Sequence, residues 1–158
     1  MPQIMKYEQR HFDAIEEYIK RYKRHFSESQ KLGLASDDVI CENYQCEKAS
    51  KDEDYAGTDA YRDLPSLGLI RVVLNFKTIW KSTHRLIVEV DKLNDDTLYI
   101  LNLRNGNKSC ELIRSIWGRK IRRAFKLGNN TVTREFLEGK WCYCVKQEFL
   151  NELPEEFQ

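Results

Sequence analysis

Three short runs rich in aliphatic and β-branched residues constrain the fold of this chain more than any other feature. They read LIRVVLNF at 69–76, RLIVEV at 85–90 and TLYILNL at 97–103. Gly68 precedes the first run, and the turn-forming residues Asn94-Asp95-Asp96 precede the third. Bounded runs of this composition favour strands. Their close spacing predicts three consecutive strands in an antiparallel meander.

The N-terminal segment shows a helical period instead. From Met5 to Phe26, apolar residues recur at steps of three and four with charged residues between them, which predicts an amphipathic helix. Serines and a glycine interrupt this period at 27–38, where we expect a loop. The next segment, VICENYQCEK at 39–48, favours a strand over a short helix.

The C-terminal half predicts a helix and then a hairpin. Apolar residues between 109 and 126 form one helical stripe, which predicts a second main helix over 109–126. TVTREFL at 131–137 and KWCYCVK at 140–146 predict two strands joined by Glu138-Gly139. A short final helix is expected from Gln147 to Leu153, before Pro154.

Length and composition place these elements in one globular domain covering residues 1–158. The chain is 41% hydrophobic and 32% charged, values typical of a folded protein with a highly charged exterior. The fold class we expect is α+β, with a mixed or largely antiparallel sheet of about five to six strands packed against two main helices.

Charge and apolar content restrict the partners. The formal net charge is +1, so any electrostatic partner must be recognised by local charge. No apolar run approaches the ~20 residues of a membrane span, and the N-terminal residues lack a signal-peptide core. We therefore expect a cytoplasmic protein without a membrane partner. The odd number of cysteines predicts reduced thiols.

The stretch KDEDYAGTDAYRDL at 51–64 concentrates carboxylates before the first β-rich run. Asp59 opens a strand, and Asn75 and Lys77 follow on the next, with their side chains on one face. Carboxylate and amide oxygens near a lysine are the groups that a hydrolytic Mg²⁺ site requires. The alternative is that Asp52, Glu53 and Asp54 belong to a solvated surface loop that leads into the strand.

The order of these features resembles the PD-(D/E)xK restriction-endonuclease-like nuclease superfamily. A helix, a strand, an acidic turn with Gly-Thr-Asp, a second strand and a third ending in x-x-K cover residues 5–77. The resemblance implies that Asp59 binds Mg²⁺, that Asn75 replaces an acidic or glutamine ligand, and that Lys77 is the family's lysine. A further glutamate often completes such a site, and the candidates are Glu16, Glu42 and Glu47. Asn75 is neutral and shorter than the expected glutamate, so Asp59 and a further carboxylate would have to neutralise the ion. The expected cofactor is Mg²⁺ if the protein is a nuclease, and none otherwise.

A basic segment at 114–126 is the second candidate site. Clustered cations of this kind bind phosphates or an acidic protein surface. Alternatively, they pair with the acidic stretch 51–63 or with the ELPEE tail. The cations are Arg114, Arg119, Lys120, Arg122, Arg123 and Lys126.

Two functions fit these patterns. The first is a non-catalytic binding protein, such as a phage or mobile-element inhibitor, that engages nucleic acid or a nucleic-acid-handling host protein through its charged surfaces. The second is a metal-dependent nuclease of the PD-(D/E)xK type, or a decayed relative. We favour binding, because the sequence does not supply a complete catalytic set.

Overall fold

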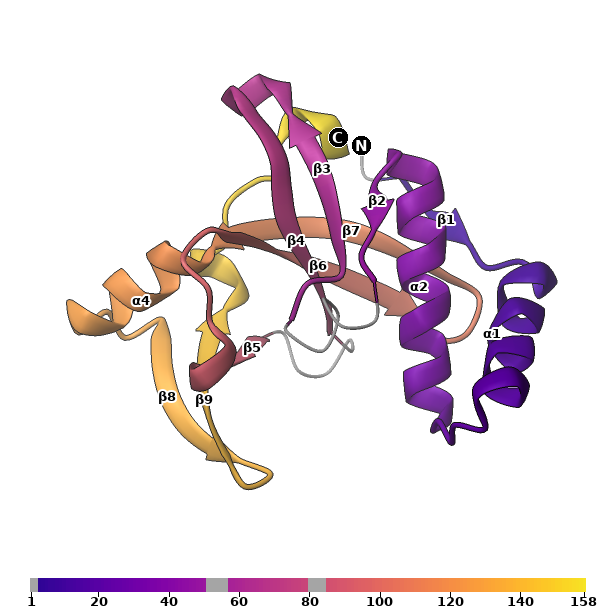
Figure 1. Ribbon diagram of the computed structural model, residues 1–158. Helices are drawn as coiled ribbons and strands as arrows, with labels where there is room; N and C mark the ends of the chain where they lie inside the picture. Colours follow the sequence, from indigo (N-terminus) through magenta and orange to yellow (C-terminus); the bar gives the residue numbers. More distant parts are fainter. Residues whose placement is uncertain (1–2, 51–56, 80–84) are drawn as a thin grey trace.

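The computed structural model describes residues 3–50, 57–79 and 85–158, and it has the α+β fold that the sequence predicts. Figure 1 shows a large curved sheet with helices α1 and α2 beside it and a smaller sheet with α4 on the other side. The large sheet has six strands in the order β1-β7-β6-β4-β3-β2, and the smaller has three in the order β5-β9-β8. The strands of the large sheet are β1 Met5–Lys6, β2 Glu47–Lys48, β3 Ala60–Leu64, β4 Leu69–Ile79, β6 Thr97–Asn105 and β7 Ser109–Trp117, and those of the smaller are β5 Arg85–Glu89, β8 Val132–Leu137 and β9 Lys140–Lys146.

The predicted strands at 69–76, 85–90 and 97–103 are present, but the predicted meander is wrong. β4 pairs with β6 in parallel, from Val73 opposite Thr97 to Ile79 opposite Leu103. β5, which comes between them in the chain, pairs with β9 in the smaller sheet. Two parallel neighbours need a long crossover connection, and here that connection contains β5. Local composition identified the strands but not their partners.

The N-terminal half contains two helices where one was predicted. α1 runs over Gln9–Tyr22 and ends at Lys23, whose φ of 51° is left-handed. α2 runs over Glu28–Tyr44, so the loop predicted at 27–38 is wrong. Of the strand predicted at 39–48, only Glu47–Lys48 is a strand, β2. The Ser27 side chain accepts a hydrogen bond from the Gln30 backbone N–H, and the Gln30 side chain accepts one from Ser27 N–H. This reciprocal cap starts a second helix.

The helix predicted over 109–126 is a strand followed by a helix. Residues 109–117 form β7, and α4 covers Gly118–Lys126. On β7, Arg114 pairs with Leu101 and Leu112 with Asn102, so Ile113 is an extra residue in the ladder. This bulge turns Leu112 and Ile116 toward different core clusters. It also breaks the alternation of a regular strand, which gave the sequence its apparent helical stripe.

The C-terminal hairpin of β8 and β9 is confirmed, with Glu138 and Gly139 between the strands. The final helix is shorter than predicted, because Gln147–Phe149 forms a single 3₁₀ turn. All five cysteines are free thiols. No helix within the described residues is long and apolar enough to cross a membrane.

Two apolar clusters hold the fold together on opposite faces of the large sheet. One lies between the sheet and α2 and includes Ile40, Leu74 and Ile100. The other includes Leu101 of the large sheet, Val145 of the smaller sheet and the α4 side chain of Ile121. α4 begins at a glycine because a Cβ at Gly118 would collide with the carbonyl oxygen of Asn94. The second cluster therefore fixes the smaller sheet and α4 against β4 and β6.

Candidate functional site

Asp59 and Asn75 meet where β3 begins beside β4. The pairing of Ala60 with Leu74 brings Asp59, one residue earlier, next to Asn75. The Asp59 carboxylate accepts a hydrogen bond of 2.7 Å from the backbone N–H of Phe76, and Asp59 N–H donates to the Leu74 carbonyl at 2.9 Å. The side chain of Asp59 thus joins the start of β3 to β4, as well as carrying a negative charge there.

Asn75 has an oriented side chain with one unpaired atom. Its Nδ2 donates a 2.7 Å hydrogen bond to the carbonyl of Gly57, which fixes the amide in one orientation. The residue is 7% exposed, and its Oδ1 is buried without a hydrogen-bond partner in the described structure. A buried acceptor left unsatisfied costs about 1–3 kcal/mol. The orphan oxygen therefore marks a place where a hydrogen-bond donor or a cation would be favourable.

Lys77 is a half-buried amine two residues further along the same face of β4. Loss of hydration lowers the pKa of Lys77, and the nearby carboxylates of Asp59 and Glu89 oppose that shift. Within the described residues, the side-chain amine of Lys77 makes no hydrogen bond or ion pair. An anion placed at its amine would supply the missing partner and favour the charged form.

Asn75 and Lys77 line a cavity of about 520 Å³ where β4 of the large sheet meets β5 and β9 of the smaller one. Its wall carries four cationic side chains and two carboxylates, Lys77, Arg85, Lys92 and Lys140 against Glu89 and Glu138. Lys140 and Lys92 both pair with Glu89, at 2.9 Å and 3.4 Å. The hydrogen bond from Lys140 is the main reason that the pKa of Glu89 is lowered. Arg85 pairs with Glu135 at 2.7 Å, so Lys77 is the one cation of the wall whose side chain forms no ion pair with a described residue. An anionic ligand would be favourable beside it.

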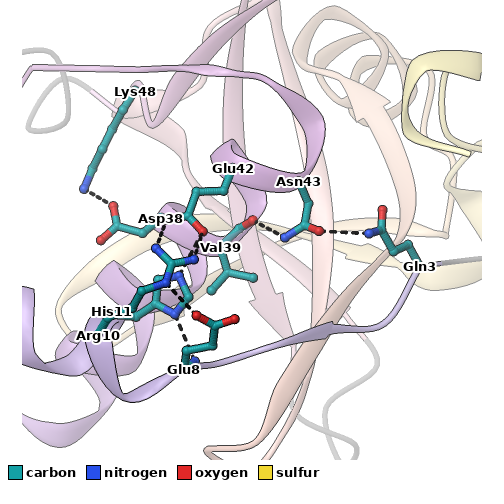
Figure 2. A network of polar contacts seen from close by, with 9 residues as sticks. All are labelled: Gln3, Glu8, Arg10, His11, Asp38, Val39, Glu42, Asn43 and Lys48. Atoms are coloured by element: carbon teal, nitrogen blue, oxygen red, sulfur yellow. Dashed lines mark hydrogen bonds and ion pairs between the residues drawn. The ribbon is translucent and has the colours of Figure 1, made fainter.

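The glutamates proposed to complete a metal site are engaged elsewhere. Glu16 pairs with Lys31 at 2.9 Å, and Glu47 pairs with Arg71 at 3.4 Å. Glu42 lies on α2 and faces α1, where the guanidinium of Arg10 at 2.7 Å and then the imidazole of His11 at 3.0 Å lower its pKa to about 2 (Figure 2). None of the three lines the cavity.

The described side chains at the Asp59 corner do not by themselves complete a Mg²⁺ site. Among the described residues, no group of three His, Cys, Asp or Glu side chains is close enough to hold a metal ion. Asp59 and the Asn75 amide oxygen supply fewer protein ligands than a dedicated site of hard oxygen donors needs. Asp52, Glu53 and Asp54, from the acidic stretch, lie outside the described residues.

Two of the six cations in the basic segment 114–126 form ion pairs with carboxylates of the described protein. Arg119 pairs with Asp96, and Arg122 pairs with Asp95 at 2.8 Å. These partners come from the turn before β6, and neither the acidic stretch nor the C-terminal tail supplies them. The remaining members differ in their contacts: Arg114 donates to the Leu150 carbonyl, Lys120 donates to the Asn151 side chain, and Arg123 and Lys126 are exposed.

Sequence reasoning found Asn75 and Lys77 but missed the opposite wall of the cavity. Arg85 and Glu89 are four residues apart on one strand, so their spacing alone places them on the same face. Lys140 follows the hairpin turn on β9. Their convergence on β4 depends on the pairing of β5 with β9, for which the sequence offers no local signal.

Comparison with models of known protein families gives no match for this chain. Comparison with curated proteins gives none either. The class of protein is therefore defined by its fold and site: an α+β protein with a cationic cavity between two sheets.

Proposed function

We propose that this protein is a non-catalytic binding protein that holds the phosphates of a nucleic acid in the cavity between its two sheets. The observation that carries this proposal is Lys77, whose half-buried amine forms no hydrogen bond or ion pair with the described residues and feels only the more distant charges of Asp59 and Glu89. It lies in a wall where cations outnumber carboxylates. A phosphate oxygen would accept hydrogen bonds from Lys77 and from Lys92 and Lys140, which share the single carboxylate of Glu89.

The cavity also has the size and mixed polarity of a ligand site. Ligand pockets measure ≈ 300–1,000 Å³, a range that includes the 520 Å³ found here. The Tyr99 ring and the Leu137 side chain provide apolar surface beside the cations. This combination suits a nucleotide unit better than a bare inorganic anion.

The test is binding of labelled single- and double-stranded DNA and RNA at several salt concentrations, followed by fluorescence anisotropy. Release of counterions makes log K fall linearly with log salt, with a slope of ≈ −0.7 per phosphate contacted on a single strand. We expect Lys77→Gln to weaken binding for all sequences and to reduce the steepness of that slope by about 0.7, the contribution of one phosphate contact.

The matched control is Lys126→Gln, which removes an exposed charge from α4 and should leave binding unchanged. A loss with Lys126→Gln but not with Lys77→Gln would move the binding surface to α4. Absence of salt-sensitive binding to every nucleic acid would overturn the proposal and favour an acidic surface on a host protein as the partner.

A metal-dependent nuclease is the second candidate, and the order of elements favours it. α2 and β2 are followed by Asp59 at the start of β3 and by Asn75 and Lys77 on the antiparallel neighbour β4. The test is cleavage of the same nucleic acids with Mg²⁺ or Mn²⁺. Asp59→Asn is preferable to Asp59→Ala, because asparagine can still accept the Phe76 hydrogen bond. Cleavage lost in both Asp59→Asn and Lys77→Ala would support the nuclease, and binding without cleavage would exclude it.

A further inference from the structure

The tip of the β8–β9 hairpin carries two exposed aromatic rings. Phe136 is 59% and Trp141 is 51% exposed. The two residues are direct partners in the ladder, and their ring centroids lie 5.3 Å apart at an interplanar angle of 63°. Large aromatic side chains are usually buried, or occupied at an interface. This pair lies near the tip of the β8–β9 hairpin, which belongs to the smaller sheet and extends away from the large one (Figure 1).

The hairpin holds the rings in a defined position. Glu138 and Gly139 form its turn with φ values of 50° and 81°. Two consecutive positive φ angles are characteristic of the type I′ turn, whose twist matches that of paired strands. Pairing then continues without interruption from Leu137–Lys140 to Val132–Val145. The aromatic pair is therefore preorganised, and a ligand that contacts it would not have to order the segment first.

A cation accompanies the rings. The guanidinium carbon of Arg134 lies 5.2 Å from the centroid of a Trp141 ring. Arg134 and Phe136 share one face of β8, because they are two residues apart. An aromatic surface with an adjacent arginine attracts groups that combine a flat ring with negative charge.

The opposite face of the same hairpin forms part of the cationic cavity. Leu137, Lys140 and Cys142 line that cavity, whereas Phe136 and Trp141 point the other way because neighbours along a strand alternate. Lys140 and Trp141 are consecutive residues. The hairpin tip thus has a cationic side chain for phosphate on one face and aromatic rings for stacking on the other. β8 is the edge strand of the smaller sheet.

We propose that Trp141 and Phe136 form a stacking site for unpaired bases of a single-stranded nucleic acid whose phosphates enter the cavity. This inference rests on the proposed function and extends it, because it selects single strands over duplexes. Paired bases are stacked on one another inside a duplex and cannot present a free face to Trp141. Stacking of bases on aromatic side chains tolerates any base sequence, so no sequence preference is expected from this site.

The experiment compares a fluorescent oligothymidylate with an abasic oligomer of the same length, which has the same phosphates but no bases. Stacking on an aromatic side chain is worth ≈ 1–3 kcal/mol per base. We therefore expect the wild-type protein to bind the oligothymidylate about tenfold more tightly than the abasic chain. Trp141→Leu should remove most of that difference and leave binding of the abasic oligomer unchanged, while Trp141→Phe should restore part of it.

The outcomes separate this inference from the proposed function. Unchanged binding of the abasic oligomer by Trp141→Leu also shows that the variant is folded. Equal wild-type affinity for both oligomers, with salt-sensitive binding intact, would overturn the stacking site and leave the proposed function standing. Failure to bind either oligomer would overturn the stacking site, and it would overturn the proposed function as well if no duplex or RNA binds in the salt series. A Trp141→Leu variant that retains the full preference for bases would also refute the stacking role of Trp141.

Discussion

Asp59 holds the start of β3 against β4 through both its backbone and its side chain. Its carboxylate accepts the Phe76 N–H at 2.7 Å in a partly buried corner. Asp63 accepts the Arg71 N–H at the same distance, but in an exposed position. Water can replace a lost acceptor at the surface more readily than in the interior. The two aspartates are therefore a matched pair for measuring what the corner contributes to folding.

We expect Asp59→Ala to lower the free energy of unfolding by about 1–2 kcal/mol, because it leaves a partly buried N–H without its charged acceptor. Asp63→Ala should lower it by less than about 0.5 kcal/mol. Urea denaturation of the two variants and the wild type measures both values. Equal losses in the two variants would show that the Asp59 carboxylate has no special structural role, which would strengthen its assignment to chemistry.

At the scale of elements, the junction between α1 and α2 depends on a cap. The reciprocal hydrogen bonds of Ser27 and Gln30 satisfy backbone donors that would otherwise be unpaired at the start of α2. α2 supplies Ile40 and Tyr44 to the cluster beneath the large sheet. The position of that helix therefore affects the whole first core cluster.

Ser27→Ala should destabilise the protein by about 1 kcal/mol, the usual cost of losing a serine N-cap. Ser29→Ala, two residues away at an exposed position of α2, is the control and should change stability little. Thermal unfolding followed by circular dichroism compares the two. A loss with Ser29→Ala as large as that with Ser27→Ala would contradict the capping role.

The elements also show which parts of the fold can be predicted from the sequence. The strands β4, β5, β6, β8 and β9 were readable because their composition is a local property. The N-terminus of α2 could have been predicted too, because Ser27 and Gln30 form a capping pattern. The serines in this segment were interpreted as a loop instead. The start of α4 was hidden by the bulge at Ile113, which gave a strand the spacing of a helix.

The candidate site could also be predicted only where the information is local in the sequence. Asn75 and Lys77 could be placed on one face from their spacing alone. Glu89 and Lys140 could not be joined to them, because the pairing of β5 with β9 and the parallel pairing of β4 with β6 are long-range contacts. The three glutamates named as candidates beside Asp59 form ion pairs elsewhere in the fold, with partners that the sequence did not indicate.

At the scale of the whole molecule, the packing of two sheets encloses an amine at a cost to stability. Burial lowers the pKa of Lys77 below its usual 10.5. Below that lowered pKa, both the folded and the unfolded protein carry the charge, and the folded state bears the full cost of desolvating it. Between the lowered pKa and 10.5, the unfolded state binds more protons, so the contribution of Lys77 to stability rises with pH.

Lys77→Met should therefore stabilise the protein by about 1 kcal/mol at neutral pH, because it removes a desolvated charge and keeps the length of the side chain. The same loss of charge should weaken nucleic-acid binding. The gain over the wild type should shrink as pH approaches 10.5, where the wild-type amine is neutral in the folded state. Urea denaturation at pH 7 and near pH 10 measures this difference, and the titrations of other groups cancel between the two proteins.

Lys126→Met, at an exposed site on α4, should show neither the gain nor its pH dependence. A Lys77→Met protein less stable than the wild type at pH 7 would mean that Lys77 is retained for folding rather than for binding an anion.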